Sequence, residues 1–409
     1  MQLISIIVLS CQLAATPLGN TILMSTNLSL TAHQKQRIRT LHDDSFQAYC
    51  ATCGYEPDEH AELLLGMAKA KFEYILDGID IKDIPTNLGS RLISAIVKMR
   101  AATDFFEFRN VEHEERRQYI CAAITRLVPR LPIAYDYAAR LCKDIGLVQP
   151  SLAKPASIAQ LIESVPIISN WDFEFNAFVT GASLIDEIPC ICVYETLLST
   201  CAAFLHCIVP FVLDFKEKAK LADIKDAEAM GKQPDFINEL HDCITMAMGK
   251  TNFVKQGAVE TEKNTYSTVH VMVEASVQFV WYHEFGHLLQ GHLAQPQSNQ
   301  LEFDADSFAF RIIAHEPKDQ SLDIWFALGS LMPLVIIDIL ETVSQLHEAQ
   351  SHPAAKLRIE RGVHAFKTDN PRAVRPALGY LRSLAAVCNP TLKSHWGVSL
   401  DYEYLTVDS

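Results

Sequence analysis

The sequence has little positive charge compared with its negative charge. It contains 35 Lys and Arg residues against 49 Asp and Glu residues, so its formal net charge at pH 7 is −14. Binding to a nucleic-acid backbone requires clustered Lys and Arg side chains that displace counterions. The composition therefore argues against a nucleic-acid partner.

Glycine and proline are also scarce, and we find no internal repeat or low-complexity tract. The 409 residues include only 16 Gly and 18 Pro, and 49% of them are hydrophobic. This composition is typical of a folded protein and excludes a disordered or fibrous chain. Because a single core rarely serves a chain of this length, we expect more than one domain.

The cysteines lack the arrangement of a disulfide framework. Their number, 11, is odd, and many lie in apolar runs such as Cys190-Ile-Cys192. Disulfide-stabilised secreted domains use even sets of cysteines at regular spacing. We therefore expect buried, reduced thiols and a cytoplasmic protein. Cys50-Ala-Thr-Cys53 has the spacing of a redox or zinc-binding pair, but the two further ligands that a structural zinc site needs do not follow it.

Long hydrophobic runs are few. The N-terminal run 3–9 has no preceding Lys or Arg and no clean cleavage site, so a strand is favoured over a signal peptide. The apolar stretch 196–213 is interrupted by a histidine and a proline, and the stretch 324–337 has the length of a buried core helix. Membrane association is thus the alternative to a cytoplasmic protein and is not favoured.

Apolar residues recur at three-to-four spacing along most of the chain, which predicts a predominantly helical α+β protein. We expect a helical N-terminal region at 1–150, with a possible first strand, and a second helical region with a charged linker at 151–235. A third domain follows at 236–409. Within it, the segment 265–273, TYSTVHVMV, has the β-branched alternation of a strand, and a long amphipathic helix at 274–293 comes directly after it.

The motif H-E-x-x-H lies in that helix, as His283-Glu284-Phe285-Gly286-His287. Residues four apart on a helix are offset by about 40°, so both imidazoles can face one metal ion. Glu284 lies one step further round, where it can act as general base on a water held by the metal. This pattern predicts a Zn²⁺ site and makes 236–409 a zincin-like catalytic domain with an active-site helix and a small sheet.

A catalytic zinc needs a third protein ligand. The extended pattern H-E-x-x-H-x-x-G-x-x-H fails, because Gly291 and His292 each lie one place away from the positions that it requires. On a continuous helix His292 also points to the face opposite His283. We therefore expect the third ligand to come from a different element.

Glu302 is the leading candidate for that ligand, in the sequence Leu-Glu-Phe-Asp-Ala-Asp at 301–306. The turn at 295–299 allows a second helix to fold back across the first and present this carboxylate to the metal. Asp306, four residues later, shares the same helical face and can accept a hydrogen bond from a ligand histidine. Asp304 or Asp306 as the third ligand is the alternative.

The HEFGH and E-F-D-A-D segments, the apolar helix after them, and Ser351-His352-Pro353 with Arg358 together resemble the gluzincin-type peptidases. Over residues 270–362 the sequence is similar in particular to the HtpX-like metalloproteases and to the phage-exclusion protease family Lit, whose known member cleaves a translation elongation factor. The resemblance implies hydrolysis of a protein or peptide substrate, in phage defence or a stress response.

The resemblance also implies roles for two residues after the apolar helix. His352 would donate a hydrogen bond to the oxyanion of the tetrahedral intermediate, and Arg358 would hold the acidic residues behind the ligands or a substrate carboxylate. The alternative is that His352-Pro353 is an ordinary helix N-terminal turn and that Arg358 is a solvated charge.

The predicted function is therefore zinc-dependent peptide hydrolysis with Glu284 as general base. The rival hypothesis is a helical interaction or sensor protein whose metal site is structural or degenerate. Residues 1–235 carry no catalytic signature and could recognise a partner. Such a role is compatible with both hypotheses.

Overall fold

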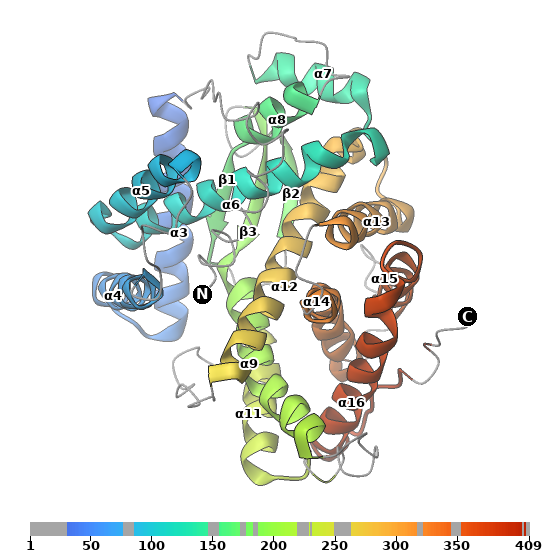
Figure 1. Ribbon diagram of the computed structural model, residues 1–409. Coiled ribbons are helices and arrows are strands. Elements are labelled where there is room, and N and C mark those ends of the chain that lie inside the picture. Colours follow the sequence, from blue (N-terminus) through green and yellow to red (C-terminus); the bar gives the residue numbers. More distant parts are fainter. Residues whose placement is uncertain are drawn as a thin grey trace. The chain divides into compact units, whose positions relative to one another are not determined.

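The computed structural model describes residues 31–76, 86–145, 155–171, 177–182, 187–218, 229, 231–248, 263–316, 322–344, 353–402 and 405. Over these ranges the protein is helical apart from one three-stranded sheet (Figure 1). The predicted class, a predominantly helical α+β fold, is confirmed. The run 3–9, predicted to form a strand, and His352 lie outside the described residues.

The chain forms two compact units, and both are discontinuous in sequence. The first consists of Met1–Asp172, Ala177–Glu195 and Leu288–Gln295, and the second of Phe173–Asn176, Thr196–His287 and Pro296–Ser409. The predicted division at 150 and 235 assumed domains that follow one another along the chain, and it stays a prediction.

The first unit contains the sheet and most of the N-terminal helices. Its elements are α3 (Ala32–Cys53), α4 (Pro57–Leu76), α5 (Thr86–Ala101), α6 (Phe105–Leu127), η2 (Val128–Arg130), α7 (Tyr135–Asp144), α8 (Pro155–Ser164), β1 (Ile167–Asn170), β2 (Ala177–Ala182), β3 (Glu187–Tyr194) and η4 (His292–Ala294). The strand order is β1-β3-β2, with β1 parallel and β2 antiparallel to β3. The central strand is apolar and fully buried over 190–194, as a strand covered on both faces must be.

Buried charges join α6 to the residue that follows β3. Glu195 accepts hydrogen bonds from Arg109 at 3.4 and 2.7 Å, and the same guanidinium also contacts Glu112. His113 Nε2 lies 2.8 Å from the hydroxyl of Ser169 on β1. Because removing one partner of a buried ion pair leaves an uncompensated charge, this cluster fixes α6 to the sheet more strictly than apolar contacts alone.

The second unit is a helical assembly of α9 (Glu195–Lys218, except its first residue), α11 (Pro234–Ala247), α12 (Lys263–Leu289), α13 (Asn299–His315), α14 (Asp323–Ser344), α15 (Ala355–Asp369) and α16 (Pro371–Trp396). In Figure 1, α14 lies among α12, α13, α15 and α16. Residues 326–336 of α14 are all buried, which makes this helix the core of the unit.

The strand predicted at 265–273 is wrong, because α12 is helical over the whole of Lys263–Leu289. Its residues 269–286 are buried without interruption. A helix buried on every side needs no amphipathic period, and the helix penalty of a β-branched residue, about 0.5 kcal/mol, is small beside the 1.5–3 kcal/mol gained when its side chain is buried. The three strands in the described part of the chain therefore all belong to the first unit, and the segment before the motif is helical.

The packing of α12 against α14 is close enough to bring the two backbones together. The hydroxyl of Ser276 donates to the carbonyl of Met272, at 2.9 Å, and to that of Gly329 on α14, at 2.7 Å. A Cβ atom at Gly329 would lie 2.5 Å from the carbonyl oxygen of Met272. Only glycine fits at this crossing, which sets the position of α12 in the unit.

Among the described residues, α14 is the one helix long and apolar enough to cross a membrane, over Asp323–Ser344. In the protein 72% of its most apolar window is buried, and the core helix of a soluble protein satisfies the same criteria. Ten cysteines fall in the described part of the chain, all of them buried and none in a disulfide.

Candidate metal centre

The candidate ligands come from the last two turns of α12 and the first turn of α13. The helix α12 ends at Leu289, and Gly291, with φ of 72°, takes the left-handed conformation that turns the chain away. His292 therefore lies in η4, outside the helix on which its orientation was predicted. The chain continues to Asn299, where α13 begins.

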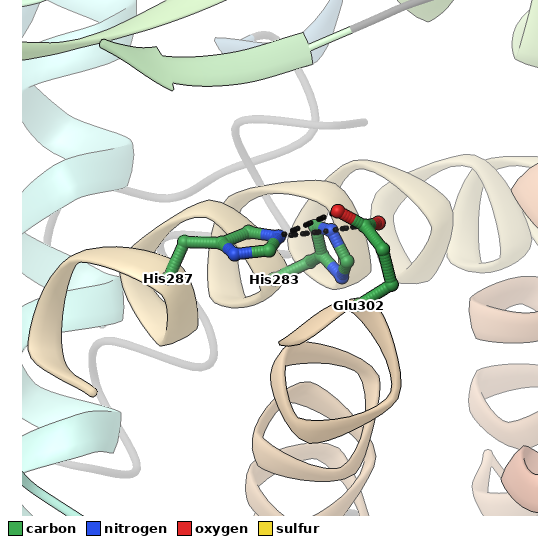
Figure 2. Close-up of side chains that lie close together, drawn as sticks. All are labelled: His283, His287 and Glu302. Carbon is green, nitrogen blue, oxygen red and sulfur yellow. Dashed lines mark hydrogen bonds and ion pairs between the residues drawn. The ribbon is translucent and has the colours of Figure 1, made fainter. Parts of the chain in front are cut away.

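His283, His287 and Glu302 converge on one point, and we call them the ligand cluster. Figure 2 shows the two imidazoles on α12 and the Glu302 carboxylate on α13 directed toward one another. The Nε2 atoms of His283 and His287 are 3.0 Å apart. The two oxygens of Glu302 lie 3.5 Å from His283 Nε2 and 3.4 Å from His287 Nε2.

These separations suit a tetrahedral metal ion. Ligand atoms about 2.0–2.1 Å from a zinc ion lie about 3.3 Å from one another across the tetrahedral angle. The three pairs in the ligand cluster measure 3.0, 3.4 and 3.5 Å. It is the one group of three or more His, Cys, Asp or Glu residues in the described chain whose ligand atoms all come within 4.8 Å of one another.

A second layer of charged groups supports the ligand cluster from behind. Nδ1 of His283 lies 2.9 Å from Asp306, which favours a proton on Nδ1 and leaves Nε2 able to bind a metal. Arg358, on α15, donates to both oxygens of Asp306, at 2.7 and 2.8 Å, and its guanidinium also lies 3.7 Å from Glu302. Asp306 is 1% exposed and Arg358 6%, so water does not weaken these contacts.

The pKa values follow from burial and from this crowding of charge. Burial disfavours the imidazolium form of His283, but its contacts with Asp306 and Glu302 outweigh burial and raise its pKa to about 10. Burial raises the pKa of Glu284, and the neighbouring Glu302 adds to the rise while the two imidazoles oppose it. Burial acts in the same direction on Asp306, yet Arg358 and His283 hold the pKa of that carboxyl below its usual range.

A glycine within the motif lets α13 approach α12. A Cβ atom at Gly286 would lie 3.2 Å from Cα and 3.3 Å from the carbonyl oxygen of Ala305, and 3.3 Å from Cβ of Phe308. All three atoms belong to α13, the helix that carries Glu302. The motif H-E-x-x-H allows any residue at this position, so the need for glycine becomes visible only from the packing of α13 against α12.

The structure brings most of the predicted site residues together. Glu284 is 3% exposed and adjoins the ligand cluster in sequence. Asp304, an alternative ligand, instead accepts a hydrogen bond from Gln300 at 2.7 Å on the exposed side of α13. Arg358 is buried rather than solvated. His352 lies outside the described residues, so its predicted contact with an oxyanion stays a prediction.

Comparison with known proteins finds one family model that matches part of the chain. Residues 234–377, which run from α11 into α16 and include the ligand cluster and its supporting residues, match the model of a family described as Peptidase U49. No curated protein and no solved structure matches the chain. The match supports a peptidase and places the similarity in the part of the chain that carries the ligand cluster.

We predict that Gly286→Ala lowers the free energy of unfolding by about 1–3 kcal/mol, the usual cost of forcing extra volume into a packed contact. The new methyl group meets backbone atoms of α13, which cannot rotate away as a side chain can. Chemical denaturation of the two proteins measures the difference.

Gly379→Ala is the matched control, because Gly379 lies within α16 and a Cβ atom there meets nothing within 4 Å. Helix propensity alone should make that variant more stable, by up to about 1 kcal/mol. If Gly286→Ala were stabilised to the same extent, the close approach of α13 to α12 would be disproved.

Proposed function

We propose that this protein is a zinc-dependent peptidase that hydrolyses a protein or peptide substrate, with Glu284 as general base. The observation that carries the proposal is the ligand cluster: two histidines of H-E-x-x-H and a glutamate from the next helix meet within metal-binding distance. The match of this segment to Peptidase U49 supports the reaction class. A glutamate as third ligand supports the gluzincin type.

The charges around the ligand cluster favour a divalent cation. Three buried carboxylates, those of Glu284, Glu302 and Asp306, face a single buried guanidinium, that of Arg358. Buried charge that is not compensated is strongly unfavourable. Without a metal, the raised pKa values of His283 and Glu284 offset this excess by protonation. A cation of charge +2 held by His283, His287 and Glu302 would take the place of these protons, and imidazole with carboxylate is a ligand set that zinc accepts.

The number of ligands supports a catalytic role over a structural one. Structural zinc sites are closed by four protein ligands, whereas catalytic sites use three and leave one position open. Three groups converge here among the described residues. This observation favours the peptidase over the rival hypothesis, in which the metal site of a helical interaction or sensor protein is structural or degenerate.

The residues of the chain then have distinct tasks. His283, His287 and Glu302 would hold a zinc ion, whose Lewis acidity would be available to a scissile carbonyl and to water. Glu284 takes a proton from the attacking water and passes it to the leaving amine. Asp306 keeps the His283 ring in one tautomer and orientation, and Arg358 keeps Asp306 ionised and in place. The absence of disulfides among the described cysteines supports a cytoplasmic location.

We predict that the loss of zinc affinity is larger for substitution of a metal ligand than for substitution of a residue that contacts a ligand. His283→Ala, His287→Ala or Glu302→Ala each removes a metal ligand, so each should release zinc almost completely, because two protein groups retain a catalytic zinc poorly. Asp306→Ala should be milder and weaken zinc binding about 10- to 100-fold, as the loss of an outer partner does. Zinc dissociation constants, measured by competition with a chelator, test this order.

Asp304→Ala is the control, since Asp304 accepts an exposed hydrogen bond from Gln300 and is not part of the ligand cluster, so this variant should keep the wild-type zinc affinity. A larger loss of affinity from Asp306→Ala than from Glu302→Ala would show that the aspartate is the ligand. Full zinc occupancy in the double variant of His283 and His287 would refute the whole assignment.

Glu284→Gln should retain both the fold and the zinc while lowering the rate of peptide hydrolysis by about 10²-fold or more, because a positioned base is lost. The substrate is found by expressing the intact chain and searching for new protein N-termini, with Glu284→Gln as the inactive reference. Hydrolysis at the wild-type rate in this variant would remove Glu284 as the base. If expression of the wild type and expression of the variant yield the same set of protein N-termini, the rival hypothesis is favoured.

A further inference from the structure

A hollow of about 780 Å³ lies along α13 and α15 in the second unit. Helix α13 contributes Phe303, Ser307 and Arg311, and α15 contributes residues between Leu357 and Asp369. Leu405 completes the lining. We call this hollow the α13–α15 groove. Its volume is in the range of sites that bind ligands. None of its lining residues belongs to the ligand cluster.

The groove lies on the outer faces of the two helices that build the metal centre. On α13, Glu302 and Asp306 are buried toward the cluster, whereas Ser307 and Arg311, four residues apart, are exposed along the groove. On α15, Arg358 is buried against Asp306, and Arg361 is exposed in the groove. Figure 1 shows α13 and α15 as neighbours. The same two helices therefore hold the ligands on one side and form a surface site on the other.

The lining of the groove is more basic than the protein as a whole. Three cationic side chains line it, those of Arg311, Arg361 and Lys367, with two carboxylates, those of Glu360 and Asp369. A local excess of positive charge contrasts with the net charge of −14 for the chain. Such a reversal of sign attracts anionic groups to one place on an otherwise repelling surface.

Apolar side chains and a fixed guanidinium give the groove a further selectivity. Arg361 stacks over the ring of Phe303, with its guanidinium carbon 3.5 Å from the ring centroid. This cation–π contact places the guanidinium before any ligand arrives. Leu357 is 50% exposed at the groove, and the buried side chains of Phe303 and Val363 also line it. The groove therefore offers apolar contacts between its charges.

We propose that the α13–α15 groove is an exosite that binds an acidic, partly apolar segment of the protein substrate. This rests on the proposed function, because it assigns the substrate of the same peptidase a second contact. A compact anion such as phosphate would meet Glu360 and Asp369 as well as the cations. A peptide can place its carboxylates on Arg311 and Arg361, its apolar side chains on Leu357, and its backbone N–H groups toward the two acids.

An exosite acts by raising the local concentration of the scissile bond. Binding of one segment of the substrate makes entry of a second segment into the active site an intramolecular event. Groove residues should then affect KM and leave kcat unchanged, because the contacts are the same in the ground state and in the transition state. Substitutions in the groove can therefore be distinguished from substitution of Glu284, which should lower kcat.

Direct binding tests the proposal without any need for hydrolysis. The protein is the full chain carrying Glu284→Gln, and the probe is a fluorescently labelled ten-residue peptide of alternating Glu and Leu. The same peptide with Gln in place of Glu is the neutral reference. We expect fluorescence anisotropy to show binding of the acidic peptide, weakened by added salt, and at least about five-fold weaker binding of the neutral one.

The double substitution Arg311→Gln and Arg361→Gln should weaken binding of the acidic peptide by about five-fold or more, because two charge contacts are lost. The matched control is Lys232→Gln with Lys393→Gln, which removes the same charge at exposed positions that do not line the groove. The control should stay within about two-fold of the parent. Circular dichroism of both double variants verifies that they are folded.

Three outcomes would overturn the exosite: no binding of the acidic peptide, equal binding of the neutral peptide, or equal effects of the groove variant and the control. Failure of the peptidase itself is seen separately, in zinc content and in hydrolysis. A protein that binds the acidic peptide through the groove but holds no zinc would refute the proposed function and leave the groove as a peptide-binding site.

Discussion

The ligand cluster depends on one buried chain of contacts, from Arg358 through Asp306 to His283. The carboxylate of Asp306 lies between the guanidinium of Arg358, at 2.7 and 2.8 Å, and the imidazole of His283, at 2.9 Å. Each contact fixes an orientation: Arg358 holds both oxygens of Asp306, and Asp306 holds one edge of the His283 ring. A carboxylate buried to 1% exposure is tolerable only with such partners. Three helices, α12, α13 and α15, are thereby fixed to one another at the site.

Close helix packing makes these short contacts possible. Gly286 lets α13 approach α12. Gly362 lets α15 approach α13 and α14, since a Cβ atom there would lie 2.6 Å from the Phe310 ring and 2.7 Å from the Leu331 side chain. Both glycines lie within helices, where glycine is otherwise unfavourable. Their cost in helix stability is offset by the approach of the helices that carry Glu302 and Arg358. The geometry of the site is therefore set in part by two glycines that bear no side chain to bind a metal or transfer a proton.

The sequence predicted the local features of this protein well, because helical period and motif spacing act over a few residues. H-E-x-x-H on a helix, a second helix after the turn at 295–299, and Glu302 with Asp306 on one face all depend on contacts of four residues or fewer. The strand predicted at 265–273 failed because burial on every side of α12 overrode the preference of β-branched residues. The two interleaved units and the groove were not foreseen, since they depend on packing between segments distant in sequence.

The central claim is that two imidazoles and one carboxylate bind a zinc ion at the end of α12. X-ray absorption at the zinc edge of the purified, zinc-loaded protein tests it most directly, because the spectrum reports the type, number and distance of the ligand atoms. We predict nitrogen and oxygen ligands at about 2.0–2.1 Å, with multiple scattering from two imidazoles and no sulfur. A sulfur shell at about 2.3 Å would place the zinc on the cysteines instead and would contradict the account.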